Sequence, residues 1–300
     1  MPNSRTLKSL FLPHAALIAT VLFWGMSFSS SKVVLNTGFP PLSLAFIRFL
    51  LASMHLFPVL KMREPETKIT RKTLLPLMLS GLFGVTVYFF FENTGIKYTT
   101  ASSAALIIGS IPIFTIGADY LLYRQSVEWY RIGGVFISLA GVYLLIGNPG
   151  GVPLRPGMLL GNLLMLGACL SWVAYIQFSR NLKTDFSGIS LTTYQVMFGT
   201  VFLLPLALAE HRSWIMVGPK IWLNIFYLGI FCSAVCYFLY LYALARLETI
   251  VVSSYINVIP VAGAAGGVVL LGENLTPVQL LGGAVVITGV LIVNLKYIRQ

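Results

Sequence analysis

Residues 23–32 read FWGMSFSSSK, and residues 171–180 read SWVAYIQFSR. An offset of 148 residues places Trp24 on Trp172 and pairs the cations Lys32 and Arg180. The same ungapped offset aligns four further pairs, which are Gly81 with Gly229, Pro112 with Pro260, Gly134 with Gly282 and Gly141 with Gly289. Because Trp and Pro coincide in one register across half of the chain, the sequence indicates an internal duplication.

Both stretches lie within long apolar segments. The 300-residue chain is 57% hydrophobic and 10% charged, with a mean hydropathy of +0.85, whereas soluble domains are about half apolar and a quarter charged. A membrane helix needs roughly 20 apolar residues, so the length allows about ten spans. The apolar runs predict helices at residues 13–35, 42–61, 74–94, 99–122, 130–147, 157–180, 187–209, 218–244, 249–271 and 277–296.

These runs are too long and too evenly apolar for barrel strands, and lipid offers the backbone no hydrogen-bond partners, so we expect helices. The predicted fold is an all-α integral membrane protein with ten transmembrane helices as two inverted five-helix repeats, since an odd number of helices makes the second repeat enter from the opposite face. Inverted repeats place a solute site near the membrane midplane and let one half rock against the other. The predicted segments are a cytoplasmic N-terminus (1–12), a first repeat (13–147), a periplasmic linker (148–156), a second repeat (157–296) and a cytoplasmic C-terminus (297–300).

The basic residues predict the orientation. Fourteen Lys and Arg residues fall in segments on the N-terminal side of the membrane and five on the other side, so the positive-inside rule places both termini in the cytoplasm, at a bacterial inner membrane. Topology thus accounts for the net charge of +11, and the scattered cations form no stripe for nucleic acid. Cys169, Cys232 and Cys236 lie in apolar stretches, which predicts neither disulfides nor a metal site, and we expect no cofactor.

Several short motifs carry a resemblance to a known family. In the first half these are FWGMSF at 23–28, Ser31-Lys32, Pro40-Pro41, Arg48-Phe49, residues 101–103 (ASS), Pro112, Gly133-Gly134 and Gly141, and in the second half they are Pro260, Gly272-Glu273, Gly282-Gly283 and Gly289. Their order resembles two EamA domains of the drug/metabolite transporter superfamily, with Arg124-Gln125 replacing the Gly-Glu of the second half. The resemblance implies a ten-helix carrier for amino acids, their derivatives, nucleosides or drugs, often an exporter.

Two polar and aromatic stripes are candidates for the wall of a solute cavity. Trp24, Ser27 and Ser31 share one helix face by their spacing, and the second half carries the equivalent stripe Trp172, Tyr175 and Ser179. Further polar candidates on neighbouring predicted helices are Tyr88, Asn93, Tyr237, Tyr240 and Asn257. Abundant aromatic residues with few fixed charges favour an amphipathic or aromatic solute, although small and hydroxyl residues also serve helix packing.

Arg48, Glu92 and Asp119 are charged residues inside predicted helices. Arg48 is an intramembrane cation, which costs about 2.5–3.5 kcal/mol when unpaired, and we expect it to pair with Glu92 as a gate, a proton site or a structural clamp. Asp119 lies about one turn from the cytoplasmic end of its helix. Arg124 and Arg131 are within reach for a local charge pair, and the rival interpretation is a carboxylate that couples transport to protons.

Two other classes of protein compete with a transporter. An enzyme would need a convergent catalytic set, and the sequence contains neither H-E-x-x-H nor G-x-S-x-G, so we expect no enzymatic activity. A non-transporting membrane sensor or scaffold is the alternative, but it leaves the duplication and the interior Trp residues without a purpose. The expected partners are a small-molecule substrate, the lipid bilayer and protons as coupling ion. The glycines of residues 263–267 favour close helix packing over a dimer face, so we expect a monomer.

Overall fold

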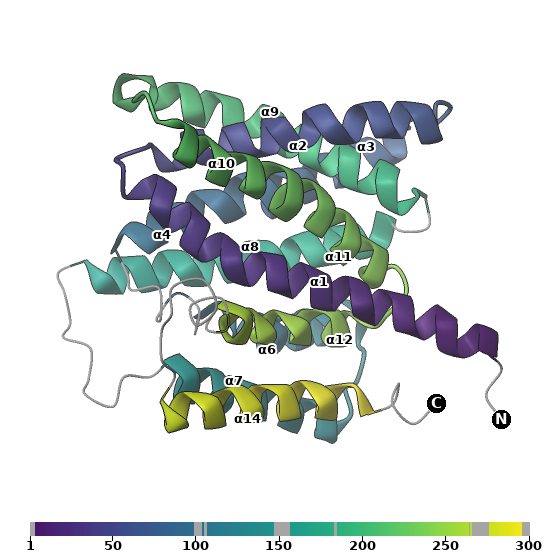
Figure 1. Ribbon diagram of the computed structural model, residues 1–300. Coiled ribbons are helices and arrows are strands. Elements are labelled where there is room, and N and C mark those ends of the chain that lie inside the picture. The colour runs from purple at the N-terminus through teal and green to yellow at the C-terminus, as the bar shows by residue number, and fades with distance from the viewer. Residues whose placement is uncertain are drawn as a thin grey trace.

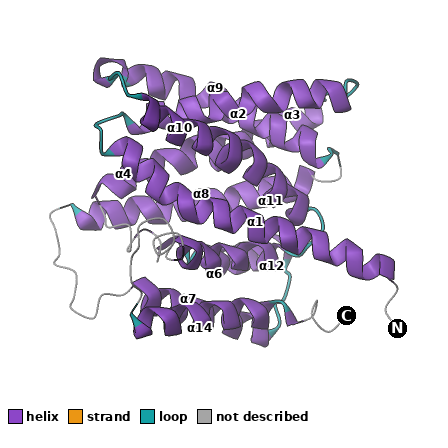
Figure 2. Cartoon of the chain, in the orientation of Figure 1, coloured by secondary structure: helices purple, strands orange, loops and turns teal. Residues whose placement is uncertain are grey.

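The computed structural model describes residues 4–98, 104, 107–146, 157–182, 185–263, 265 and 276–295. All regular structure in these ranges is helical, as predicted (Figure 2). The predicted linker 148–156, the C-terminal residues 297–300, and the motif residues 101–103 and 272–273 lie outside the described residues.

The helices follow the apolar runs closely. The first half contains α1 (Ser4–Leu35), α2 (Pro41–Arg63), α3 (Arg71–Gly81), η1 (Leu82–Val87), α4 (Tyr88–Tyr98), α6 (Ile111–Tyr123) and α7 (Trp129–Ile146). The second half contains α8 (Met158–Leu182), α9 (Gly188–Ala209), η2 (His211–Ser213), α10 (Pro219–Tyr227), η3 (Leu228–Val235), α11 (Cys236–Leu244), α12 (Thr249–Ser254), η4 (Tyr255–Val258) and α14 (Pro277–Val293). Because α1 starts at Ser4, the first helix is longer than the predicted 13–35.

Six helices of the described chain are long and apolar enough to cross a membrane, namely Phe11–Leu35, Pro41–Arg63, Arg71–Ile96, Leu159–Leu182, Gly188–Ala209 and Pro219–Leu244. Four shorter apolar helices accompany them, namely Ile111–Tyr123, Trp129–Leu144, Thr249–Gly263 and Pro277–Val293. The start of α1 and the end of α14 lie at the same end of the bundle, which we call the terminal end (Figure 1). The other end is called the distal end.

Two of the long helices contain a π-helical segment at the same place in the repeat. The span Arg71–Ile96 includes η1, and the span Pro219–Leu244 includes η3. At the offset of 148 residues, η1 falls on residues 230–235, inside η3. A π segment replaces the usual i to i+4 hydrogen bonds and leaves carbonyl groups open to other donors.

The helices α7 and α14 pack side by side at one edge of the bundle (Figure 1). A Cβ atom on Gly134 would lie 2.8 Å from the carbonyl oxygen of Gly289, and one on Gly141 would lie 2.8 Å from that of Gly282. The offset of 148 residues exchanges these two contacts, because it carries Gly134 to Gly282 and Gly141 to Gly289. The two helices are therefore related by a local pseudo-twofold arrangement. Only glycine permits this close approach.

Candidate functional site

A cavity lies between the two halves of the chain. Its walls come from α1, α2, α4, α6, α8, α11, η4 and the adjoining residues, and they comprise Trp24, Ser27, Phe28, Ser31, Arg48, Tyr88, Phe89, Glu92, Ile96, Ile108, Ile111, Trp172, Tyr237, Ile256 and Ile259. The cavity volume of about 40 Å³ holds a few water molecules and no metabolite. A solute therefore requires the surrounding helices to move apart.

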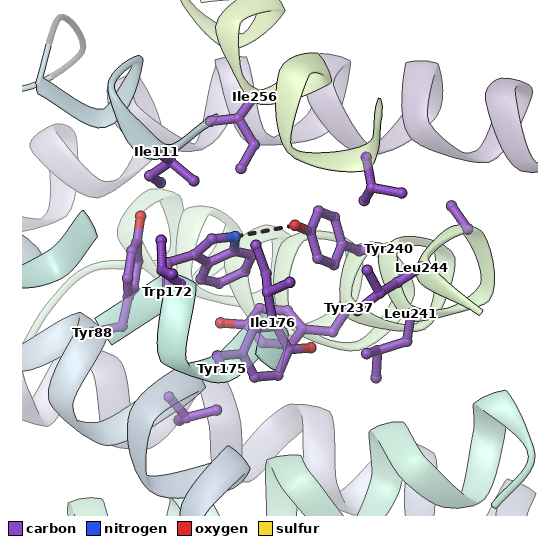
Figure 3. Packing of buried hydrophobic residues seen from close by; sticks show 14 of the residues in the cluster. Tyr88, Ile111, Trp172, Tyr175, Ile176, Tyr237, Tyr240, Leu241, Leu244 and Ile256 are labelled. Carbon is purple, nitrogen blue, oxygen red and sulfur yellow. Dashed lines mark hydrogen bonds between the residues drawn. The ribbon is translucent and has the colours of Figure 1, made fainter. Parts of the chain in front are cut away.

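The two tryptophans of the repeat meet in this cavity. The ring centroids of Trp24 and Trp172 lie 5.3 Å apart with an interplanar angle of 83°, the edge-to-face geometry that aromatic pairs favour. Figure 3 shows Trp172 among Tyr88, Tyr175, Tyr237 and Tyr240, with its Nε1 donating a hydrogen bond to Tyr240 Oη at 3.3 Å. The centre of the protein is thus an aromatic cluster contributed by both repeats.

The π segments provide hydrogen-bond acceptors to this cluster. Trp24 Nε1 donates to the carbonyl oxygen of Cys232 in η3 at 3.0 Å, and Tyr237 Oη donates to the carbonyl oxygen of Gly84 in η1 at 2.7 Å. Gly84 and Cys232 are equivalent at the offset of 148 residues. Each repeat therefore opens its helix at the same carbonyl, and a ring of the cluster satisfies it.

Arg48 and Glu92 both line the cavity but make no direct ion pair. Arg48 Nε donates to Ser233 Oγ at 2.9 Å, and its guanidinium lies over the ring of Phe89 at 4.6 Å from the centroid. Glu92 Oε1 accepts from Tyr88 Oη at 3.1 Å. The ion pairs within 4.0 Å in the described part of the chain involve Arg131 and Arg180 only. A cation and a carboxylate thus share one cavity, each held by neutral neighbours.

The two predicted stripes differ in their surroundings. Trp24, Ser27 and Ser31 line the cavity, and Trp172 reaches it from the second half. Tyr175 and Ser179 are not among its lining residues, and they are at most 1% exposed. Ser179 Oγ accepts a hydrogen bond from Gln195 Nε2 at 2.9 Å. The first stripe is therefore open to the cavity, whereas Tyr175 and Ser179 of the second stripe are packed in the interior.

Of the remaining polar candidates, Tyr88 and Tyr237 line the cavity, whereas Tyr240 lies behind Trp172. Asn93 Nδ2 donates to the carbonyl oxygen of Pro41 at 2.9 Å, between α4 and α2. Asn257 Nδ2 donates to Ser138 Oγ at 2.5 Å, between η4 and α7. Both amides are buried and bridge helices outside the cavity wall.

Asp119 is bound by a residue that the sequence prediction did not consider. Its Oδ1 accepts from Arg180 Nη1 on α8 at 3.2 Å, whereas the predicted partner Arg131 pairs with Glu128 and Glu248. Sequence distance favoured Arg124 and Arg131, but the fold brings α8 closer. Asp119, Arg124, Arg131 and Arg180 line a second cavity of about 640 Å³ at the terminal end.

The apolar residues of the cavity wall are not predicted by the sequence motifs. Ile108, Ile111, Ile256 and Ile259 carry no chemical signature in a chain of this composition, yet all four contact the cavity. The repeat contained a signal that identifies them, because the offset of 148 residues carries Ile108 to Ile256 and Ile111 to Ile259. Phe89 is carried to Tyr237 in the same way, so equivalent residues of both repeats share the cavity wall.

Apolar helices around a cavity with aromatic and charged walls are typical of membrane carriers. The profile of the EamA-like transporter family matches residues 12–147 and 159–295. The chain belongs to the EamA-like transporter family, and it is a multi-pass membrane transporter.

Individual relatives have similar lengths. An uncharacterized transporter of Archaeoglobus fulgidus is 29% identical over 94% of this chain and 97% of its own. A probable terminal-alkyne amino-acid exporter of Streptantibioticus cattleyicolor is 27% identical over 93% and 92%, and a probable amino-acid metabolite efflux pump of Salmonella typhimurium is 28% identical over 92% and 92%. A solved crystal structure has the same fold, with a TM-score of 0.78 at 19% sequence identity. The match covers 96% of this chain and 98% of the chain in that structure.

Proposed function

We propose that this protein is a secondary transporter that exports amino acids or related amphipathic and aromatic solutes, drugs included, across the bacterial inner membrane. It alternates access between two inverted five-helix repeats. Six long and four shorter apolar helices are consistent with ten spans. The equivalent π segments and the reciprocal glycine contacts of α7 and α14 support the repeat.

One observation carries the proposal of alternating access. Five cavity residues of the first repeat have second-repeat equivalents, at the offset of 148 residues, that lie outside the cavity wall and are at most 2% exposed. The cavity residues are Ser27, Phe28, Ser31, Glu92 and Ile96, and their equivalents are Tyr175, Ile176, Ser179, Tyr240 and Leu244. Related halves in two different packings are what alternating access requires, because exchanging the packings turns the cavity to the other end.

The packed half contains polar atoms that favour a second state. Gln177 Oε1 and Gln195 Oε1 are buried without a hydrogen-bond partner, and each such group costs about 1–3 kcal/mol. Both belong to the second repeat, on the closed side of the aromatic cluster. Water that enters when this side opens would hydrate them, which lowers the free energy of the alternative packing.

The side chains of the cavity wall favour binding of a zwitterionic solute. Arg48 offers a guanidinium to a carboxylate, Glu92 offers a carboxylate to an ammonium group, and the rings of Trp24, Trp172 and Phe89 offer an apolar surface to a side chain. The names of the two relatives that mention amino acids agree with this chemistry. The bias of Lys and Arg supports a cytoplasmic terminal end, and we propose that the carrier functions as a monomer.

The test is a counterflow screen in proteoliposomes with and without a pH gradient. Apolar and aromatic amino acids are expected to exchange faster than their amides and their decarboxylated amines. Glu92→Gln should slow exchange at least about tenfold, because an ion pair with the ammonium group is lost, while Glu66→Gln in an exposed loop should leave it unchanged. Export is tested by comparing everted with right-side-out vesicles. Absence of exchange for every amino acid, nucleoside and drug would favour a sensor or scaffold.

A further inference from the structure

The carboxylate of Asp119 joins the two repeats at the terminal end. It lies near the end of α6 and is 4% exposed. Its Oδ1 accepts from Gln177 Nε2 at 2.9 Å and from Arg180 Nη1 at 3.2 Å, and its Oδ2 accepts from the hydroxyl of Thr249. Asp119 belongs to the first half, and all three donors belong to the second half. Its two oxygens therefore hold three donors from α8 and α12 against α6.

Contacts around Arg180 reinforce this connection. The guanidinium lies over the ring of Tyr123 at 4.4 Å from the centroid, and its Nη2 donates to Gln125 Oε1 at 3.1 Å. Tyr123 Oη in turn donates to Asn181 Oδ1 at 3.0 Å. The last turn of α6 is thus fastened to the last turn of α8.

These contacts stand where the terminal end would have to open. Asp119, Arg180 and Thr249 line the 640 Å³ cavity, together with Leu244. Leu244 is 2% exposed and belongs to the same hydrophobic core cluster as Trp172, Tyr237 and Tyr240. Solute access from the terminal end therefore requires α6 to part from α8 and α12.

The sequence does not repeat this set of side chains at the equivalent positions. The offset of 148 residues carries Asp119 to Gly267, Gln177 to Ser29 and Thr249 to Ala101, and only the cation of Arg180 is retained, as Lys32. The same offset preserves the Trp and Ile pairs of the cavity. The duplication thus kept the pairs of the cavity wall but did not copy Asp119 and its hydrogen-bond donors into the other repeat.

We propose that Asp119 is a one-sided latch that holds the resting carrier closed at its terminal end. The inference rests on the proposed alternation of access and specifies which end is favoured at rest. Opening the terminal end breaks three hydrogen bonds to the Asp119 carboxylate, and this carboxylate has no counterpart in the second repeat, where the equivalent residue is Gly267. The latch therefore biases the population towards the packing described above.

A reporter cysteine tests the latch without any solute. Ser179→Cys places a thiol in the packed stripe, and a membrane-impermeant maleimide measures its accessibility in nanodiscs, with the parent chain giving the background from Cys169, Cys232 and Cys236. Adding Asp119→Asn should raise the labelling rate about tenfold, the effect of one lost charge-assisted hydrogen bond on a two-state equilibrium. Glu128→Gln is the matched control, because it removes a charge from the same cavity but pairs within the first repeat.

A second variant keeps the test valid if Asp119→Asn fails to fold. Thr249→Val removes one donor and retains the carboxylate, and it should raise labelling about threefold. The double variant Thr249→Val with Asp119→Asn should label no faster than Asp119→Asn alone, because both changes act on one contact. Unchanged labelling in the folded variants overturns the latch, as does an equal increase in Glu128→Gln. Fast labelling of the parent reporter also overturns it. A labelling difference without solute exchange in counterflow supports the latch and rejects the proposed solute.

Discussion

Trp24 and Trp172, which are equivalent in the sequence repeat, contact one another edge to face at a centroid distance of 5.3 Å. This contact joins the two copies of the repeat at equivalent positions. Their hydrogen bonds differ, since Trp24 donates to a backbone carbonyl and Trp172 to the hydroxyl of Tyr240. The two equivalent rings therefore lie in chemically different surroundings.

The hydroxyl group of Tyr237 donates a hydrogen bond to the π segment η1. Tyr237→Phe leaves the buried carbonyl of Gly84 without its side-chain donor and should cost about 1–3 kcal/mol of stability. Thermal unfolding in detergent, followed by intrinsic fluorescence, measures the decrease in melting temperature. Tyr143→Phe changes an exposed tyrosine and is the control, so an equal decrease in both variants would contradict the prediction.

The contact between α7 and α14 depends on Gly134. A Cβ atom there would lie 2.8 Å from the carbonyl oxygen of Gly289, whereas one on the adjacent Gly133 would meet nothing within 4 Å. Gly134→Ala should therefore destabilise the protein by about 1–3 kcal/mol through overpacking, and Gly133→Ala should not. The two melting temperatures should separate by several degrees. Equal values would mean that the helices shift without cost.

Glu210 caps the start of α2 from the other half of the chain. Its Oε2 accepts hydrogen bonds from Leu42 N, Ser43 N and Ser43 Oγ. Glu210→Ala should lower stability by about 1–2 kcal/mol, the usual cost of losing a helix cap, and Glu66→Ala in an exposed loop should have no effect. Chemical unfolding of both variants in the same detergent compares them directly, and a neutral Glu210→Ala would exclude a stabilising cap.

Arg48 is expected to recognise the carboxylate of the solute. Arg48→Gln should reduce exchange of amino acids at least about tenfold and abolish the preference over their amides, because a charge-assisted contact is replaced by a neutral one. Counterflow with paired acid and amide substrates measures both effects. Arg63→Gln changes an exposed cation at the end of the same helix. A variant at Arg48 that retains the preference for the acid would exclude this role.

Part of the site was accessible from the sequence. Spacing, charge and the repeat predict eight site residues that the structure places on one cavity. They are Trp24, Ser27, Ser31, Arg48, Tyr88, Glu92, Trp172 and Tyr237. Asn93 and Asn257 are predicted cavity residues, because they add polar groups to helices that the repeat places around the same interior, but the structure gives them partners on neighbouring helices. A polar group within a membrane helix needs a hydrogen-bond partner. A polar residue satisfies the same need by facing a cavity or by bridging helices, so its identity alone does not distinguish the two.

The sequence by itself determined the helical membrane fold and the register of the duplication, because apolar length and unusual residues are properties of the chain that need no partner. Only the tertiary structure decided that one stripe is open and its equivalent closed, and that Asp119 binds Arg180 instead of Arg124 or Arg131. The reason is that two copies of one pattern can pack in two ways. Which packing forms depends on contacts between helices that are distant in the sequence.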